Sequence, residues 1–170
     1  MKRIDKIAGI VPIVPTPFAA DETIDYAALR RLVDFAIASG CRAVCLPAYA
    51  SEFYKLDPAE RLEVVETAVA QARGRIDVIA QVNYASAIQA VENARVAQKA
   101  GTNAINAAVP RMFPVGERDL LRYFGRILDA IDLPLVIQDF NPGGPSIGAG
   151  FISQLHRVHS NSATSSSRSR

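Results

Sequence analysis

The chain has 170 residues, of which 49% are hydrophobic and 21% charged, and its formal net charge is +2. This composition is ordinary for a globular domain with a sizeable core. Basic side chains are scattered except at the extreme C-terminus, which argues against nucleic acid as a partner. We find neither a membrane-spanning run nor a signal-peptide segment, and therefore expect a cytoplasmic protein without a membrane partner.

Short apolar runs alternate with segments of helical periodicity along the chain, which predicts five strand–helix units. The expected strands are 10–18, 43–46, 78–82, 104–109 and 135–138. The expected helices are 25–40, 57–74, 86–101, a fourth around 120–131, and a short fifth from about 151 to 156. Because the strands are short and apolar, both faces of the predicted sheet should be buried.

Capping signals support the helix starts. Asp25 precedes the first apolar stripe, and Asp57, Pro58 and Glu60 together form a strong start signal for the second helix. Ser86, with a glutamine three residues later, is the expected cap of the third helix. Glycine ends each of these three helices.

Strand starts recur about every 30 residues, and this alternation predicts a parallel sheet with right-handed crossovers. Two architectures fit: a five-stranded doubly wound sheet, or an unfinished (β/α)8 TIM barrel. Chain length alone favours the first. Residues 158–170 are rich in serine and arginine and break the pattern, which predicts a tail that is either disordered or frameshifted.

In both architectures ligands bind at the carboxyl ends of the strands. The loop at 48–56 is the most distinctive of those that follow a strand. Its small residues Ala48, Ala50 and Ser51 would let a carboxylate approach backbone N–H groups. Glu52 is either a general base or, as we favour because no basic partner is evident, a structural acceptor that ties loops together.

The two cysteines, Cys41 and Cys45, would lie about 13 Å apart on one extended strand, too far for a disulfide. Further metal ligands are not found nearby. We therefore interpret both as core residues and expect neither a metal nor a cofactor.

Several segments, taken in order, resemble one family. They are Gly9-Ile10-Val11-Pro12, Thr16-Pro17-Phe18, the loop Ala48-Tyr49-Ala50-Ser51-Glu52, the helix end at 97–101, Val109-Pro110 and the strand entry at 132–137. From about Gly9 to Leu155 the chain resembles the dihydrodipicolinate synthase/N-acetylneuraminate lyase family of Schiff-base aldolases. The family signature Gly-Thr-Thr-Gly-Glu falls on Ala48 to Glu52.

The resemblance implies a (β/α)8 barrel truncated after about five units, with residues 1–157 as an incomplete barrel domain. It also implies a lyase that binds pyruvate or a related 2-oxo acid, works without a cofactor, and forms homo-oligomers, often tetramers. A lysine on strand six forms a Schiff base with the keto carbon in this family, and a tyrosine on strand five relays protons.

Carried over residue by residue, the site is altered. The two signature threonines fall on Tyr49 and Ala50, and paired tyrosines after strand four fall on Arg111 and Met112. Arg111 could bind a substrate carboxylate. The strand-five tyrosine falls on Gln138 or Phe140, neither of which relays a proton. The substrate-binding residues implied by the resemblance are Tyr49, Ala50, Ser51, Arg111, Gln138 and Phe140.

The catalytic lysine has no counterpart. The chain contains only Lys2, Lys6, Lys55 and Lys99. Lys55 alone lies on the expected face, but in a loop where burial could not easily lower its pKa. We therefore expect no catalytic residue within this chain, and a lyase of unknown substrate that is inactive as this fragment.

Two alternatives stay open. One is a non-catalytic protein that binds a 2-oxo acid or caps a partner barrel. The other is a complete flavodoxin-like binding domain, against which the lack of a Gly-rich turn after the first strand counts. An incomplete barrel would also expose sheet edges and be poorly soluble or marginally stable.

Overall fold

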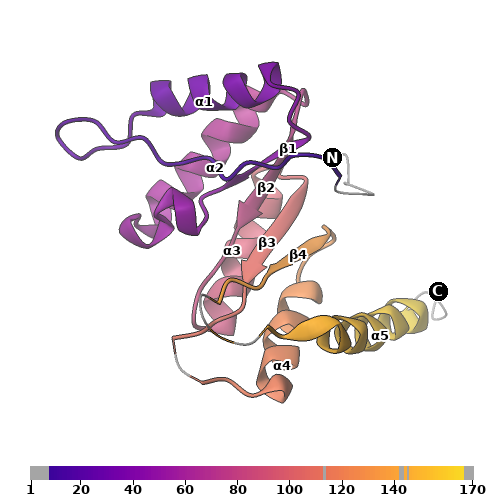
Figure 1. Ribbon diagram of the computed structural model, residues 1–170. Coiled ribbons are helices and arrows are strands. Elements are labelled where there is room, and N and C mark those ends of the chain that lie inside the picture. Colours follow the sequence, from indigo (N-terminus) through magenta and orange to yellow (C-terminus); the bar gives the residue numbers. More distant parts are fainter. Residues whose placement is uncertain (1–7, 113, 142–143, 145, 167–170) are drawn as a thin grey trace.

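The computed structural model describes residues 8–112, 114–141, 144 and 146–166, with side chains up to residue 159. The strands are β1 (Ala43–Leu46), β2 (Asp77–Gln81), β3 (Ala104–Ala108) and β4 (Leu135–Gln138). The α-helices are α1 (Tyr26–Ala38), α2 (Pro58–Ala72), α3 (Ala87–Lys99), α4 (Glu117–Leu128) and α5 (Gly148–Ser166). Two short 3₁₀ helices, η1 (Tyr49–Ser51) and η2 (Phe53–Lys55), follow β1. Figure 1 shows the resulting alternation of strand and helix.

The four strands are parallel and lie in chain order, β1-β2-β3-β4 (Figure 1). This confirms the predicted parallel α/β fold. A flavodoxin-like sheet would place its first strand in the interior of the sheet. Sequential order is instead the arrangement of a (β/α)8 barrel, in which each strand pairs with the next along the chain. The flavodoxin-like alternative is therefore wrong.

The segment 10–18 was expected to be a strand, and this expectation is wrong. It makes only isolated bridges, a parallel one from Ile13 to Cys45 and an antiparallel one from Phe18 to Ile24. Val14 N–H donates to the Cys45 carbonyl at 3.1 Å, and Cys45 N–H donates to the Pro12 carbonyl at 3.0 Å. Proline lacks the N–H that a ladder needs, and prolines at 12, 15 and 17 interrupt this segment. The sheet of the described residues therefore has four regular strands.

Local capping explains where the helices begin. The Asp25 side chain accepts a hydrogen bond from Ala28 N–H at 2.8 Å, and Asp57 and Glu60 form a reciprocal capping box. Ser86 occupies the predicted cap position of α3, but its side chain makes no capping hydrogen bond. The fifth helix extends to Ser166, well beyond the short helix expected. The origin of the 158–170 tail stays a prediction.

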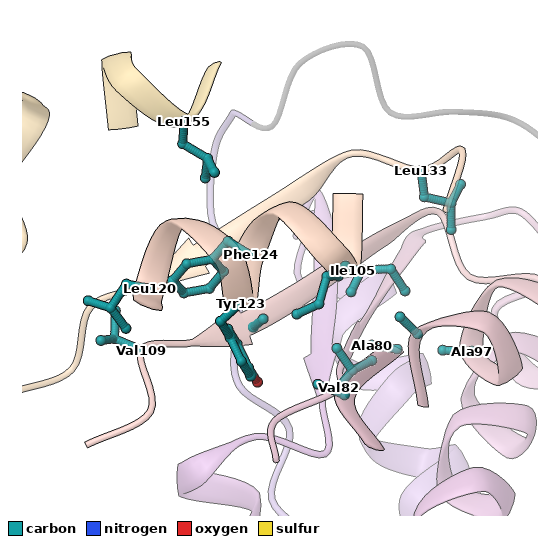
Figure 2. Close-up of a cluster of buried hydrophobic side chains, with 14 of the residues drawn as sticks. Ala80, Val82, Ala97, Ile105, Val109, Leu120, Tyr123, Phe124, Leu133 and Leu155 are labelled. Carbon is teal, nitrogen blue, oxygen red and sulfur yellow. The ribbon is translucent and has the colours of Figure 1, made fainter. Parts of the chain in front are cut away.

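Most of the core lies between the sheet and the helices. On this face the larger cluster joins alternate residues of β2 and β3 to α3, α4 and α5. Figure 2 shows Tyr123 and Phe124 projecting from α4 within this cluster, with Leu155 of α5 nearby. Phe124 also meets Phe151 of α5 in an edge-to-face contact at 6.0 Å. The described helices include none that is long and apolar enough to cross a bilayer.

The opposite face of the sheet has a different composition. Ala43, Cys45, Ile79 and Ala104 form a small apolar layer there, against which Val11 and Ile13 pack. Toward the carboxyl ends of the strands this layer gives way to buried polar side chains, Gln81 and Asn106. In a barrel this is the face that lines the interior.

Candidate functional site

The loops that follow the four strands gather at the carboxyl edge of the sheet, where sequence reasoning placed the site. The η1–η2 loop follows β1, Asn83 and Tyr84 follow β2, Arg111 follows β3, and the segment beginning at Asp139 follows β4. Parallel strands end at the same edge, so residues far apart in sequence come together here.

The η1–η2 loop is anchored through Ser51, which is fully buried. Its hydroxyl donates to the Val14 carbonyl at 2.5 Å, and its own carbonyl accepts from the Thr16 hydroxyl at 2.7 Å. Both partners belong to the proline-containing segment before α1. Ser51, predicted to bind substrate, therefore has its side chain engaged in holding two segments together.

Tyr49 and Ala50 lie at the start of this loop. Within the described part of the chain their N–H groups make no backbone hydrogen bond, whereas the next three N–H groups bond to the carbonyls of Ala48 and Tyr49. These two adjacent donors therefore remain for another acceptor. The Tyr49 ring packs edge-on to Phe53 at 5.2 Å and lies 5.7 Å from Phe140. The structure thus brings together two predicted site residues, Tyr49 and Phe140.

Glu52 does have a basic partner, contrary to expectation. Lys55 Nζ donates to Glu52 Oε1 at 3.1 Å, one turn further along the same loop. This hydrogen bond is the main reason that the pKa of Lys55 is raised from its ordinary value. A Schiff-base lysine needs a lowered pKa, so that a neutral amine is available as nucleophile. The environment of Lys55 acts in the opposite direction.

Arg111 is paired rather than available. Its guanidinium forms an ion pair with Asp139 across the ends of β3 and β4. Asp139 also accepts hydrogen bonds from the Ser146 hydroxyl at 2.6 Å and the Ile147 N–H at 2.8 Å. Together these contacts, with the Ser146 hydrogen bond the largest, hold the pKa of Asp139 below its usual value. Asp139 therefore organises the end of this loop, a role that sequence reasoning missed.

Gln138 lies on the inner face of the sheet. Its Oε1 accepts from Gln81 Nε2 at 2.9 Å. Met112, the other residue at a family tyrosine position, is 73% exposed. Among the described residues, neither Gln138 nor Met112 forms a hydrogen bond with Tyr49, whose ring packs instead against Phe53 and Phe140.

Arg61 and Asn83 also reach this edge and were not predicted. Arg61, one turn into α2, donates from Nη2 to the Asn83 carbonyl at 3.2 Å. The Tyr123 hydroxyl donates to the Tyr84 carbonyl at 2.8 Å, and burial raises the pKa of Tyr123 to about 12. Arg61 could have been predicted from its position, since the first turn of a helix that follows a site loop faces the same edge of the sheet.

Metal-binding clusters of three or more histidine, cysteine or acidic side chains are not found among the described residues. Both cysteines are free. Burial raises the pKa of the Cys45 thiol, whose sulfur accepts from Asn106 Nδ2 at 3.4 Å. Cys45 is thus a core residue, as the sequence indicated.

Comparison with known proteins gives consistent matches. Residues 6–160 match the dihydrodipicolinate synthetase family. The L-2-keto-3-deoxyarabonate dehydratase of Azospirillum brasilense is 31% identical over 152 residues, which is 88% of this chain and 49% of that protein. A probable 2-dehydro-3-deoxy-D-pentonate aldolase of Escherichia coli strain K12 is 33% identical, over 79% of this chain and 45% of its own.

Among solved structures, a prophage protein from Escherichia coli K12 of the dihydrodipicolinic acid synthase family, in complex with pyruvate, matches with a TM-score of 0.85. Sequence identity is 28%, and the match covers 90% of this chain and 52% of that one. The chain spans about half the length of the curated relatives it matches.

Proposed function

The chain belongs to the dihydrodipicolinate synthetase family of aldolase-type lyases, and from this we propose that it binds pyruvate or a related 2-oxo acid at the carboxyl edge of its sheet. The observation that carries the proposal is the position of the Ala48–Glu52 loop, which directly follows β1 and on which the sequence resemblance places the family signature. Among the described residues, the N–H groups of Tyr49 and Ala50 have no backbone acceptor, and two such adjacent donors suit a carboxylate.

In this proposal the 170 residues supply the carboxylate-binding loop and not the amine that forms the Schiff base. Lys99 is the last residue of α3, in the helical layer and away from the carboxyl ends of the strands. Lys55 is engaged by Glu52, and its raised pKa keeps the amine protonated. Within the described residues, therefore, no lysine is suited to attack a keto carbon.

A second candidate function, a binder of 2-oxo acids without turnover, follows from the same observation. The two candidates differ in one respect, which is whether a covalent bond to the ligand forms. Borohydride added in the presence of pyruvate reduces a Schiff base to a stable adduct that mass spectrometry detects.

The experiment that tests binding is a pyruvate titration followed by amide ¹H–¹⁵N shifts. We expect the largest shifts at Tyr49 and Ala50, whose N–H groups would gain an acceptor. Ala50→Thr, which restores the hydroxyl of the family signature, should tighten binding. Lactate, which keeps the carboxylate and lacks the keto group, is the matched ligand control. Shifts confined to other parts of the sheet would contradict the proposal.

A further inference from the structure

A cavity of about 500 Å³ lies beside the η1–η2 loop and is not explained by binding of a small 2-oxo acid. It is bounded by this loop, the start of α2 and the segments after β2 and β3. Its walls are mainly aromatic or apolar, and include Tyr49, Phe53, Tyr54, Tyr84 and Met112. The size and the apolar lining are those of small-molecule sites.

Arg61 provides a positive charge in this cavity. Its guanidinium lies 4.9 Å from the centre of the Phe53 ring, and its Nη2 donates only to a neutral carbonyl, that of Asn83. It forms no ion pair with a carboxylate of the described residues. A half-buried guanidinium without an acidic neighbour keeps donors available for an anion or another strong acceptor.

Asn83 also lines this cavity. The residue is 5% exposed, and its Oδ1 accepts from Ala108 N–H at 2.5 Å, which fixes the orientation of the amide. Its Nδ2 is buried and has no hydrogen-bond partner in the part of the chain that the structure describes. A buried donor without a partner is unfavourable. A ligand acceptor that reaches this amide would satisfy it.

Tyr49 joins this cavity to the carboxylate-binding loop. Its backbone N–H belongs to the loop, while its ring forms part of the cavity wall. A single extended molecule can therefore place a 2-oxo acid at the loop and its far end among the aromatic side chains.

We infer that the cavity binds a planar aromatic group that carries an acidic or hydrogen-bond-accepting substituent. The ring packs against Phe53 and the neighbouring aromatic side chains, and the substituent accepts from Arg61 and Asn83. This inference rests on the proposed function: the aromatic group is the part of the substrate that is remote from the 2-oxo acid. The substrate class is thus a 4-aryl-4-hydroxy-2-oxo acid. Breaking its C3–C4 bond gives an aromatic aldehyde and pyruvate, with one proton leaving the 4-hydroxyl and one added at C3.

The test uses the 170-residue chain with benzoate as probe and propionate as its matched control, since propionate has the carboxylate and lacks the ring. Binding is followed by shifts of the Met112 methyl and the Tyr84 amide. We expect benzoate to bind at least about tenfold more tightly than propionate. Equal affinities for the two acids would overturn the inference.

Two variants assign the contacts. Arg61→Gln should weaken benzoate binding about tenfold, and Phe53→Leu should weaken it by a similar factor. Arg30→Gln, on the exposed side of α1, should leave it unchanged. If Arg61→Gln does not fold, as judged by circular dichroism, Tyr84→Ala at the half-exposed rim replaces it. Unchanged benzoate affinity in the folded variants would overturn the inference.

A parallel pyruvate titration separates the two proposals. Pyruvate shifts at Tyr49 and Ala50 without benzoate shifts at Met112 and Tyr84 would overturn this inference and leave the proposed function standing. Benzoate shifts in the cavity without pyruvate shifts in the loop would support an aromatic site and contradict the proposed function.

Discussion

Gln81 of β2 and Gln138 of β4 are joined by a side-chain hydrogen bond of 2.9 Å, although β3 lies between their strands. Gln81 is in register with Asn106, and Gln138 with Ala108. The bond therefore passes over β3, where the small side chain of Ala108 leaves room. In a (β/α)8 barrel each interior layer is made of side chains from alternate strands. Gln81 and Gln138 come from alternate strands and form part of such a layer, in a chain that covers 52% of the length of the matched solved structure.

The Gln81–Gln138 pair should make a measurable contribution to stability. Gln138→Met removes the acceptor of a side chain that is 3% exposed, and leaves the Gln81 amide without a partner. We expect the free energy of unfolding to fall by about 1–3 kcal/mol. Urea denaturation followed by circular dichroism measures this change.

The double variant Gln81→Met/Gln138→Met is the control for that change. Replacing both polar partners by apolar side chains of similar shape can be nearly neutral. The double variant should therefore be more stable than Gln138→Met alone. A double variant as destabilised as the sum of its singles would show that the two side chains do not interact.

Ser51→Ala should loosen the candidate site from the segment before α1. The substitution removes the hydrogen bond to the Val14 carbonyl and leaves that acceptor unpaired in a buried position, at a cost of about 1–3 kcal/mol. Amide hydrogen exchange should rise in the η1–η2 loop. Ser153→Ala, an exposed serine on α5, should change stability by less than about 0.5 kcal/mol. Equal effects of the two variants would contradict the anchoring role of Ser51.

Asp139 predicts an acid-sensitive loop. Because its folded-state pKa is lowered, its contribution to stability is present above the ordinary aspartate pKa of about 3.9 and is lost as pH falls through the lower folded-state value. Asp139→Asn, which mimics the protonated form, should destabilise the protein at pH 7. The difference from the parent chain should shrink below about pH 4. Urea midpoints measured from pH 3 to 7 check this.

Asp132→Asn is the matched control for the acid series, since its carboxylate lies at an exposed position before β4. At pH 7 it should differ less from the parent chain than Asp139→Asn does. If Asp139→Asn and the parent chain keep the same difference from pH 7 to pH 3, the carboxylate of Asp139 does not supply the acid dependence.

Lys55 should not form a Schiff base with pyruvate at neutral pH. Its hydrogen bond to Glu52 raises its pKa, so the reactive neutral amine is scarce. Borohydride trapping followed by peptide mass spectrometry should find no adduct at Lys55. Glu52→Gln weakens the partner and should lower the pKa of Lys55, so any trace of adduct should increase in that variant. An adduct on Lys55 in the parent chain at pH 7 would contradict the prediction.

Local features of the fold could be predicted because their causes are local. Asp25 and Asp57 cap helices through atoms within three residues of themselves, so a short sequence window contains the whole interaction. The first strand was mispredicted because the prediction relied on the apolar character of 10–18 and neglected Pro12 and Pro15, which lack the N–H groups that a ladder needs. The segment forms only isolated bridges, at Ile13 and at Phe18.

The site was harder to predict because its interactions join distant residues. Arg111 and Asp139 are 28 positions apart, and the pairing that engages Arg111 depends on two strands ending side by side. Arg61 was overlooked because its relation to Phe53 and Asn83 depends on the angle at which α2 leaves the loop. The partner of Glu52, by contrast, is only three residues away and could have been found from spacing alone.

The sequential strand order has a consequence for how the protein is made. Each strand pairs with the one synthesised just before it, so a strand leaving the ribosome finds its neighbour already present. Closing loops of this modest length costs little entropy, and contacts close in sequence favour fast folding. The η1–η2 loop after β1 can therefore be formed and anchored by Ser51 while the later strands are still being translated.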